Sequence, residues 1–165
     1  MVQPYPATAE VPEIDRPAIP ASVLNAIKVM YAGAVVSVIH IVADVSDQGA
    51  TKTAIEKKNP SLSISSVNTI VHVALFAEVI AGLLGAILFI WIARSCRNGK
   101  NWARKTGTVL WFIAILGTVY DLTAATATLS EILNFAVVLI GLAALVLLWR
   151  ASSSAYFKYF KRPEF

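Results

Sequence analysis

Four long runs of apolar residues follow a polar N-terminal segment in this chain of 165 residues. The runs cover residues 21–45, 69–93, 103–127 and 129–149. About 20 helical residues cross a hydrocarbon core about 30 Å thick, so each run is long enough to span a membrane. A backbone in lipid must satisfy its own hydrogen bonds, which favours helices. The pattern therefore predicts an all-α fold, a four-helix transmembrane bundle over residues 21–150.

The two ends of the chain differ from this central part. Residues 1–20 contain five prolines and no apolar core, which excludes a signal peptide and predicts a flexible tail. Residues 151–165 form a second tail, in which aromatic and basic residues alternate from Ala155 to Arg162. Such an amphipathic stretch is expected to lie on the inner surface of the membrane.

The first loop, residues 46–68, is long and polar. Its segment Thr51–Lys58 is predicted to form a short interfacial helix that stops at Asn59, because the residue before a proline avoids helical geometry. Ser61 or Ser63 is then expected to cap the second span by accepting a hydrogen bond from a free backbone amide.

Lysines and arginines are distributed unevenly between the two sides of these spans. Eleven of the 14 lie on the side of the termini and the second loop, and three lie in the first loop. The positive-inside rule places the richer side in the cytoplasm, so we predict a multi-pass plasma-membrane protein with both termini inside. The side chains expected to meet anionic lipid headgroups are Arg94, Arg97, Lys100, Arg104, Lys105, Arg150, Lys158, Lys161 and Arg162.

The composition agrees with this class and narrows the partners. Hydrophobic residues make up 57% of the chain and charged residues 15%, with a mean hydropathy of +0.67, values typical of a membrane protein. The pI of about 9.3 does not indicate nucleic-acid binding, because the basic residues gather at the ends of the spans rather than along a soluble face. A single cysteine, Cys96, excludes an intramolecular disulfide.

Small and polar residues share one face of the first span. Six residues follow one another at steps of four and three, so they line one side of a helix. They are Ala26, Met30, Gly33, Ser37, His40 and Asp44. Close packing and hydrogen bonds drive helix association in lipid, so this face is expected to point at neighbouring helices. The residues expected at helix contacts across the bundle are Gly33, Ser37, Ala81, Gly82, Gly85, Gly117 and Gly141.

Five ionisable side chains are predicted to lie within the membrane, where such groups are energetically costly and are functional candidates. They are His40, Asp44, His72, Glu78 and Asp121. Glu78 lies deepest. It is expected to be protonated, or bonded to a partner such as Ser37, His40 or Asn134. Two roles stay open for it: a proton, ion or ligand site, or a structural hydrogen bond that locks the bundle.

Neither a cofactor nor a catalytic reaction is predicted from these groups. Two histidines with two acids could bind zinc, and histidines alone could hold a haem. His72 lies on a different helix face from Glu78, however, so the groups are not expected to converge, and we expect no metal and no cofactor. The chain also lacks G-x-S-x-G, HExxH and Walker motifs, so we expect no enzyme.

Three stretches of the chain carry a family resemblance. They are PASVLNAIKVMYAGAVVS in the first span, GKNWARKTGTVLWF at the start of the third, and GLAALVLLWRASSSAYF at the end of the fourth. Over residues 21–157 the chain resembles uncharacterised four-helix integral membrane proteins common in actinobacteria. The resemblance implies a cell-membrane protein of this topology and lends no catalytic residue.

Our first hypothesis for the function is a non-enzymatic membrane protein that acts through helix packing and partner contacts, as a homo-oligomer or as an accessory subunit of a larger membrane complex. The alternative is a small channel or transporter whose path is lined by His40, Asp44, Glu78 and Asp121. A path needs these side chains around one wet cavity, whereas a scaffold needs them satisfied between packed helices. We expect the polar groups in the outer half of the bundle, between the first three spans.

Overall fold

The computed structural model describes residues 17–122 and 129–160, and within these ranges every regular element is an α-helix. The all-α prediction is confirmed for this part of the chain. The helices are α1 (Ala21–Ser46), α2 (Gln48–Lys58), α3 (Ile64–Arg97), α4 (Asn101–Leu122), α5 (Leu129–Leu148) and α6 (Ala151–Tyr159).

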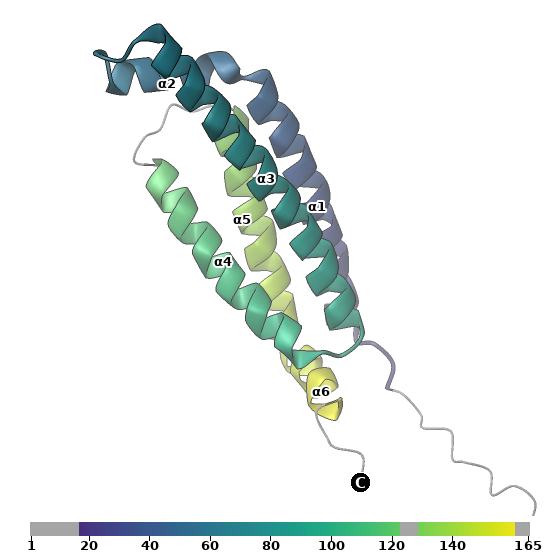
Figure 1. The fold of residues 1–165 in the computed structure, drawn as a ribbon. Coiled ribbons are helices and arrows are strands. Elements are labelled where there is room, and N and C mark those ends of the chain that lie inside the picture. Colours follow the sequence, from purple (N-terminus) through teal and green to yellow (C-terminus); the bar gives the residue numbers. More distant parts are fainter. Residues whose placement is uncertain (1–16, 123–128, 161–165) are drawn as a thin grey trace, which may run out of the picture.

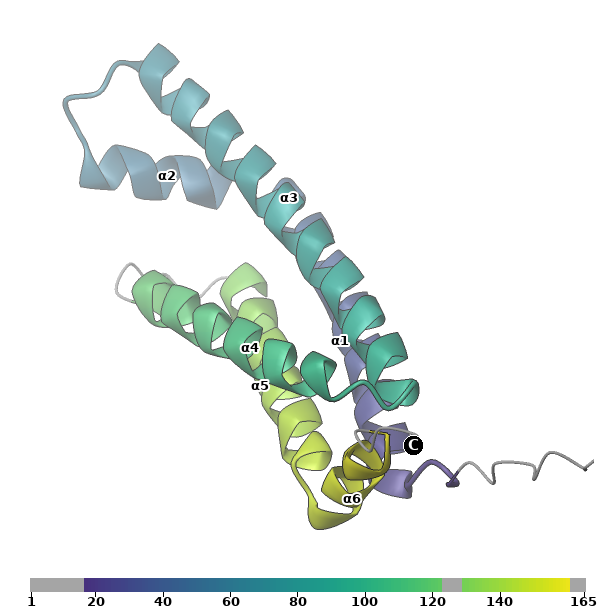
Figure 2. The same cartoon turned by 60° about the horizontal axis from the view of Figure 1, so that its bottom comes forward.

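The four long helices run up and down beside one another, and the two short ones lie at opposite ends (Figure 1). α1 is central, because it packs extensively against both α3 and α5. α4 packs against α5 and meets α3 near its own beginning, and from there α3 and α4 diverge (Figure 2). From here on, the two ends of the bundle are called the α2 end and the α6 end.

Three of these helices are long and apolar enough to cross a membrane: α1, α3 and α5. The described residues are therefore compatible with a membrane protein, as predicted. α4 is not one of the three, since its first turns carry Arg104, Lys105 and two threonines. The third span was predicted over residues 103–127, and its last part falls on residues 123–127, which lie outside the described residues.

α3 is longer than the predicted span of residues 69–93 at both ends. At its start the Ser63 hydroxyl accepts a hydrogen bond from the amide of Ser66 at 3.2 Å. Of the two predicted capping residues, Ser61 and Ser63, the second is therefore the cap. Beyond its end Gly99 has a φ of 69°, a left-handed conformation that glycine adopts without a steric penalty. With 34 residues, α3 is about 51 Å long, which exceeds the thickness of a hydrocarbon core.

The other boundaries lie close to those predicted. α1 ends at Ser46 and α5 at Leu148, each within one residue of its expected end. α2 is the short helix expected in the first loop, and it ends before Asn59 as predicted. Its Ile55 packs against a small apolar cluster on α3 that includes Val67, so this helix is attached to the bundle by hydrophobic contact.

The main hydrophobic core lies toward the α6 end, where five helices meet. Its buried members come from α1, α3, α4, α5 and α6, and none is more than 7% exposed. They are Val23, Ala26, Ile27, Met30, Ile92, Ala93, Cys96, Ala103, Ala144, Leu148, Tyr156 and Phe157. The predicted inward face of α1 contributes Ala26 and Met30 to this core, and farther along the same face Gly33, Ser37 and Asp44 are buried as well.

The C-terminal segment differs from its prediction. Tyr156 and Phe157 were expected on the membrane surface, but they are 5% and 1% exposed and lie in the core. The physical reason is a reversal of the chain at Arg150, whose extended backbone separates α5 from α6. α6 then folds back under the bundle with Ser153, Tyr156 and Phe157 buried on one face, while Lys158 stays exposed (Figure 1).

The glycines predicted at helix contacts fall into two groups. A Cβ added at Gly33, Gly82 or Gly141 would lie 3.0 Å or less from a side chain of another helix, so glycine permits the close packing at these positions. A Cβ at Gly85 or Gly117 would meet no other described atom within 4 Å. Small residues therefore mark both packed and uncovered helix faces in this chain.

Candidate functional site

Polar side chains of α1 meet α5 at the α2 end of the bundle. His40 and Asp44 lie one turn apart on α1, and Ser130 is the second residue of α5. Nε2 of His40 lies 3.1 Å from the Ser130 hydroxyl, which donates a hydrogen bond to Oδ1 of Asp44. Nδ1 of His40 lies 3.5 Å from Oδ2 of the same carboxylate. The three side chains form a closed arrangement, which we call the His40–Asp44–Ser130 ring.

The ring is largely shielded from the surroundings. The side chain of Asp44 is 6% exposed and that of His40 is 22% exposed. Oδ2 of Asp44 is buried and accepts no hydrogen bond from any described residue, although His40 lies beside it. A buried carboxylate oxygen without a hydrogen bond is unfavourable, so the ring is incompletely satisfied.

The local sequence explains one half of the ring. His40 and Asp44 are four residues apart, so they are neighbours on the surface of α1. Ser130 reaches them because α5 begins at the end of the bundle where α1 stops (Figure 1). The sequence directed attention to the polar groups between the first three spans, whereas the partner of His40 and Asp44 lies on the fourth predicted span.

Sequence reasoning missed Ser130. A signal for it was available in the topology, because in an up-and-down bundle the last turns of the first span and the first turn of the fourth lie at the same depth. Only tertiary packing, however, decides that α1 and α5 are neighbours. The same packing leaves the Ser37 hydroxyl bonded to the carbonyl of Gly33 in its own helix, at 2.9 Å.

The three residue types are those of a hydrolase triad, but one contact differs from the pattern of a triad. In such a triad the histidine accepts the serine proton, and the acid binds the histidine without contacting the serine. Here the Ser130 hydroxyl donates directly to the Asp44 carboxylate.

A cavity of about 430 Å³ lies beside the ring, between the ends of α1 and α5. Its polar lining residues are Ser46, Asp47 and Ser130. Its apolar lining residues are Ile39, Val42, Ala43, Leu129 and Leu133. Ser130 belongs to both the cavity and the ring, so it connects the buried carboxylate to the surface of the molecule.

The other predicted intramembrane groups do not join the ring. His72 and Glu78 are exposed residues of α3. Asp121 belongs to α4, and its side chain lies outside the described part. Among the residues that the structure describes, no three side chains of His, Cys, Asp or Glu lie close enough together to hold a metal ion.

Arg104 forms a second polar centre, at the α6 end. Its Nη1 donates hydrogen bonds to Oγ of Ser154 at 3.0 Å and to the Leu148 carbonyl at 3.5 Å. The guanidinium carbon lies 4.2 Å from the ring centroid of Trp149 and 5.3 Å from that of Phe157. Arg104 belongs to the set expected at lipid headgroups, and these contacts show in addition that it holds α4, α5 and α6 together.

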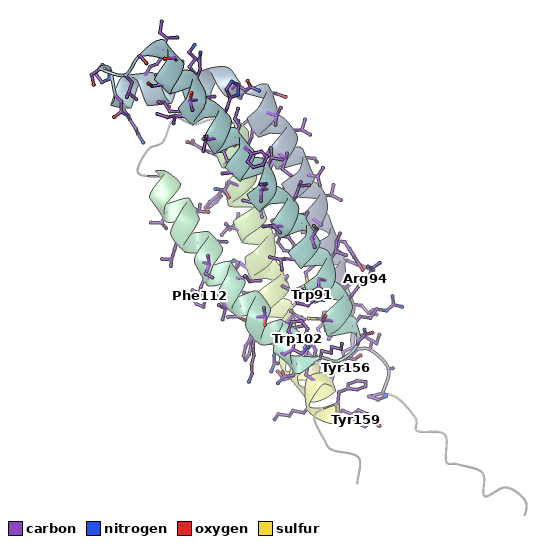
Figure 3. All side chains as sticks on the ribbon, viewed as in Figure 1. Trp91, Arg94, Trp102, Phe112, Tyr156 and Tyr159 are labelled. Carbon is purple, nitrogen blue, oxygen red and sulfur yellow. The ribbon has the colours of Figure 1, made fainter. Side chains whose placement is uncertain are left out.

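The remaining described basic residues of the predicted headgroup set are exposed. They are Arg94, Arg97, Lys100, Lys105, Arg150 and Lys158, while Lys161 and Arg162 lie outside the described residues. Figure 3 shows Arg94 at the same end of the bundle as Trp91, Trp102 and Tyr159. The rings of Trp91 and Trp102 are in contact, with centroids 5.1 Å apart. Basic and aromatic side chains therefore gather at the α6 end.

Hydrogen bonds also attach α6 to α1 and α3. Oγ of Ser22, on α1, lies 2.9 Å from Oγ of Ser152 and 2.8 Å from Oγ of Ser153. The Tyr156 hydroxyl donates to the carbonyl of Arg97, at the end of α3, at 2.7 Å. Burial raises the pKa of the Tyr156 phenol, so it remains a neutral donor at physiological pH.

No protein-family model matches this chain, and neither the curated proteins nor the solved structures contain a significant match to it. The site and the faces of the helices are therefore the basis for a functional proposal.

Proposed function

We propose that this chain is a four-span, non-enzymatic membrane protein with both termini in the cytoplasm, and that it acts as a subunit of a homo-oligomeric assembly. In this proposal α4 is the fourth span. Support comes from its large apolar side chains, which are 55% to 70% exposed and suit contact with lipid. They are Val109, Phe112, Ile113, Leu116 and Val119. The basic residues at the α6 end support a cytoplasmic location for that end.

The observation that carries the assembly proposal is a stripe of small, uncovered residues on α3 and α4. On α3 the stripe consists of Ala77, Ala81 and Gly85, at steps of four. On α4 it consists of Ala114 and Gly117. The three alanines and Gly117 are exposed, and both glycines have open space where a Cβ would lie.

Both parts of this stripe border the gap between α3 and α4. A Cβ added at Gly107 of α4 would lie 3.6 Å from Ile92 of α3, so these two residues mark the sides on which the helices face each other. Gly85 precedes Ile92 by seven residues and Ala114 follows Gly107 by seven, so each shares a face with its contact residue. Beyond this contact the two helices diverge (Figure 2), and the diverging parts, which carry the exposed small residues, are called the α3–α4 seam.

Lipid tails cover such a seam poorly. Association of helices in lipid depends on close packing between them. Small residues allow two helix backbones to approach closely, whereas large apolar side chains are as stable against lipid as against another helix. A helix from a second copy of the chain would pack against these small residues. Glu78 precedes Gly85 by seven residues and shares its face of α3.

The channel or transporter alternative has less support. It requires His40, Asp44, Glu78 and Asp121 around one path. Within the described residues, His40 and Asp44 bond to α5, whereas Glu78 lies on the side of α3 that faces α4. A single path lined by these groups does not follow from this geometry.

Cysteine cross-linking in native membranes tests the assembly. In a Cys96→Ala background, Ala81→Cys is expected to form a disulfide-linked dimer on mild oxidation. Leu83→Cys is the matched control, because Leu83 is also exposed, at 48%, but lies about 200° around the same helix. It is expected to stay monomeric.

Two outcomes contradict the homo-oligomer: a monomer with both variants, or dimers in equal yield with both. A cross-link from Ala81→Cys to a different protein would also contradict the homo-oligomer, and it would indicate that the chain is an accessory subunit of a larger complex.

A further inference from the structure

The cavity between the ends of α1 and α5 combines a few polar lining residues with a larger apolar surface. Its volume of about 430 Å³ lies within the range of small-molecule sites, about 300–1,000 Å³. We propose that it binds an amphipathic primary amine, with the ammonium group at Asp47 and the apolar chain between α1 and α5. The cavity is separate from the α3–α4 seam, so this inference does not depend on the proposed assembly.

All polar side chains of the described lining present hydrogen-bond acceptors to the cavity. The Ser46 hydroxyl donates its proton to the Val42 carbonyl at 2.7 Å, and the Ser130 hydroxyl donates its proton to Oδ1 of Asp44. The carboxylate of Asp47 has no proton to donate. A ligand that meets these groups favourably must therefore supply donors. A primary ammonium group has three donors and no acceptor.

The carboxylate of Asp47 is free to bind a ligand. Asp47 is exposed, and although it directly precedes α2, its side chain makes no capping hydrogen bond to that helix. Within residues 17–122 and 129–160, no basic side chain forms an ion pair with it. The negative charge at the cavity is therefore not neutralised by another described group.

The helix ends beside the cavity also favour a cation. The carbonyl end of a helix attracts positive charge, but the last turn of α1 has no basic residue. The amide end of α5 attracts negative charge, and Glu131 in its first turn already supplies it. No lysine or arginine is among the described lining residues, and residues 123–128, which precede α5 in the sequence, include no charged residue. The uncompensated charge at the cavity is therefore negative.

The apolar lining residues suit a hydrocarbon chain attached to the ammonium group. Ile39 precedes Asp47 by eight residues, which corresponds to about 12 Å along α1. Leu133 lines the cavity from α5. Ile39 and Val42 are exposed, so the cavity opens on a side of the two helices that lipid would cover. An amphipathic molecule can therefore enter it from the membrane.

The same lining argues against the head group of an aminophospholipid. Such a head group joins the ammonium to a phosphate, which binds hydrogen-bond donors or cations. The hydroxyl protons of Ser46 and Ser130 are already used, and Asp47 would repel the phosphate. An amine without a phosphate is therefore the better match to this cavity.

Photo-cross-linking of the full chain in phosphatidylcholine nanodiscs tests the site. The probe is a primary alkylamine with a diazirine on its chain, and mass spectrometry of peptides locates the labelled residues. Labelling is expected on α1 and α5 around Val42 and Leu133, and excess octylamine is expected to abolish it. Octanol, which has the same chain without the charge, is expected to compete at least about tenfold less well.

Two results of this experiment would overturn the proposal. One is equal competition by octanol, which would make the cavity an apolar groove without selectivity for an amine. The other is labelling spread over all lipid-facing helices, which would show that the probe only dissolves in the lipid.

Two variants test the role of the carboxylate. Asp47→Asn removes the charge and keeps the shape of the side chain, so it is expected to reduce the labelling yield about tenfold at a low probe concentration. Glu56→Gln is the matched control, because Glu56 is an exposed acid of α2 outside the described lining, and it is expected to keep the parent yield. An unchanged yield in Asp47→Asn would contradict the proposal. If this variant does not fold, the comparison of octylamine with octanol in the parent still decides.

A change of lipid separates a free amine from a lipid head group. Nanodiscs that contain phosphatidylethanolamine are expected to leave the labelling of the parent chain unchanged. Loss of labelling in these nanodiscs would assign the cavity to that head group, and it would overturn the proposal of a free amine.

Discussion

Single hydroxyl groups in this protein join helices that are distant in the sequence. Ser130 of α5 reaches His40 and Asp44 on α1, and the Tyr156 hydroxyl of α6 reaches the carbonyl of Arg97 at the end of α3. In a bundle surrounded by lipid, apolar side chains gain little by leaving the lipid, so polar contacts and close packing stabilise the arrangement of the helices. Removing one such hydroxyl therefore has consequences for whole elements.

Ser130→Ala is expected to lower the free energy of unfolding by about 1–3 kcal/mol, because it removes the hydrogen bond to a buried carboxylate. Unfolding by SDS in mixed micelles measures this change at a fixed pH. Ser46→Ala is the control, since the exposed Ser46 hydroxyl donates only to the Val42 carbonyl within its own helix. Equal losses in the two variants would contradict the role given to Ser130.

Tyr156 predicts a loss of stability at alkaline pH. Burial raises the pKa of its phenol above the ordinary value of 10.0, so the folded chain keeps the proton where the unfolded chain releases it. The stabilising contribution is complete below about pH 10 and decreases as the pH rises above that value. Thermal unfolding of the parent is expected to show this decrease, and Tyr156→Phe to show less of it. Tyr159→Phe, at an exposed position, should behave as the parent does.

At the scale of elements, the position of a glycine decides how closely two helices pack. Gly141 of α5 accommodates the indole of Trp111 from α4, since an added Cβ would lie 2.7 Å from Cδ1 of the indole. The same indole donates a hydrogen bond to the carbonyl of Val138 at 2.9 Å. Both contacts attach α4 to α5. They matter because α4 diverges from α3 beyond its first turns (Figure 2).

Gly141→Ala is expected to destabilise the bundle by about 1–3 kcal/mol, because the rigid indole must move away from α5. Thermal unfolding followed by circular dichroism measures the loss. Gly49→Ala is the control, since a Cβ at Gly49 in α2 would meet no atom within 4 Å. In a Trp111→Ala background the effect of Gly141→Ala should largely disappear; an undiminished effect would show that the indole is not the cause.

On the scale of the whole molecule, the two ends of the bundle are built differently. The α6 end contains the main core and Arg104, and α6 closes it. The α2 end contains the ring, a cavity and the diverging parts of α3 and α4. The exposed basic residues of the predicted headgroup set lie at the well-packed end. The proposed cytoplasmic side is therefore the well-packed side, and the His40–Asp44–Ser130 ring lies on the opposite side.

Labelling of single cysteines tests this orientation. In intact cells Ser63→Cys, exposed at the α2 end, is expected to react with a membrane-impermeant reagent, whereas Lys105→Cys, exposed at the α6 end, should react only after the membrane is permeabilised. Both are made with Cys96→Ala. Native Cys96 is 0% exposed, so its failure to react would not report sidedness. The reverse labelling pattern would overturn the inside-outside assignment.

The sequence by itself determined the helices, because their signals are local. Runs of apolar residues require helices in lipid, Asn59-Pro60 ends α2, Ser63 caps α3, and the small and polar face of α1 is buried as its spacing predicted. Each of these properties depends on residues within a few turns of one another. The uneven distribution of lysine and arginine between the ends of the helices also follows from the sequence alone.

Only the tertiary structure decided which helices are neighbours. It placed Ser130 against His40 and Asp44, buried Tyr156 in the core, brought Arg104 into contact with α5 and α6, and made α3 and α4 diverge. The physical reason is that apolar faces are interchangeable in lipid. Which helices become neighbours depends on how individual side chains fit between helices that are distant in the sequence. That fit cannot be derived from the order of the residues alone.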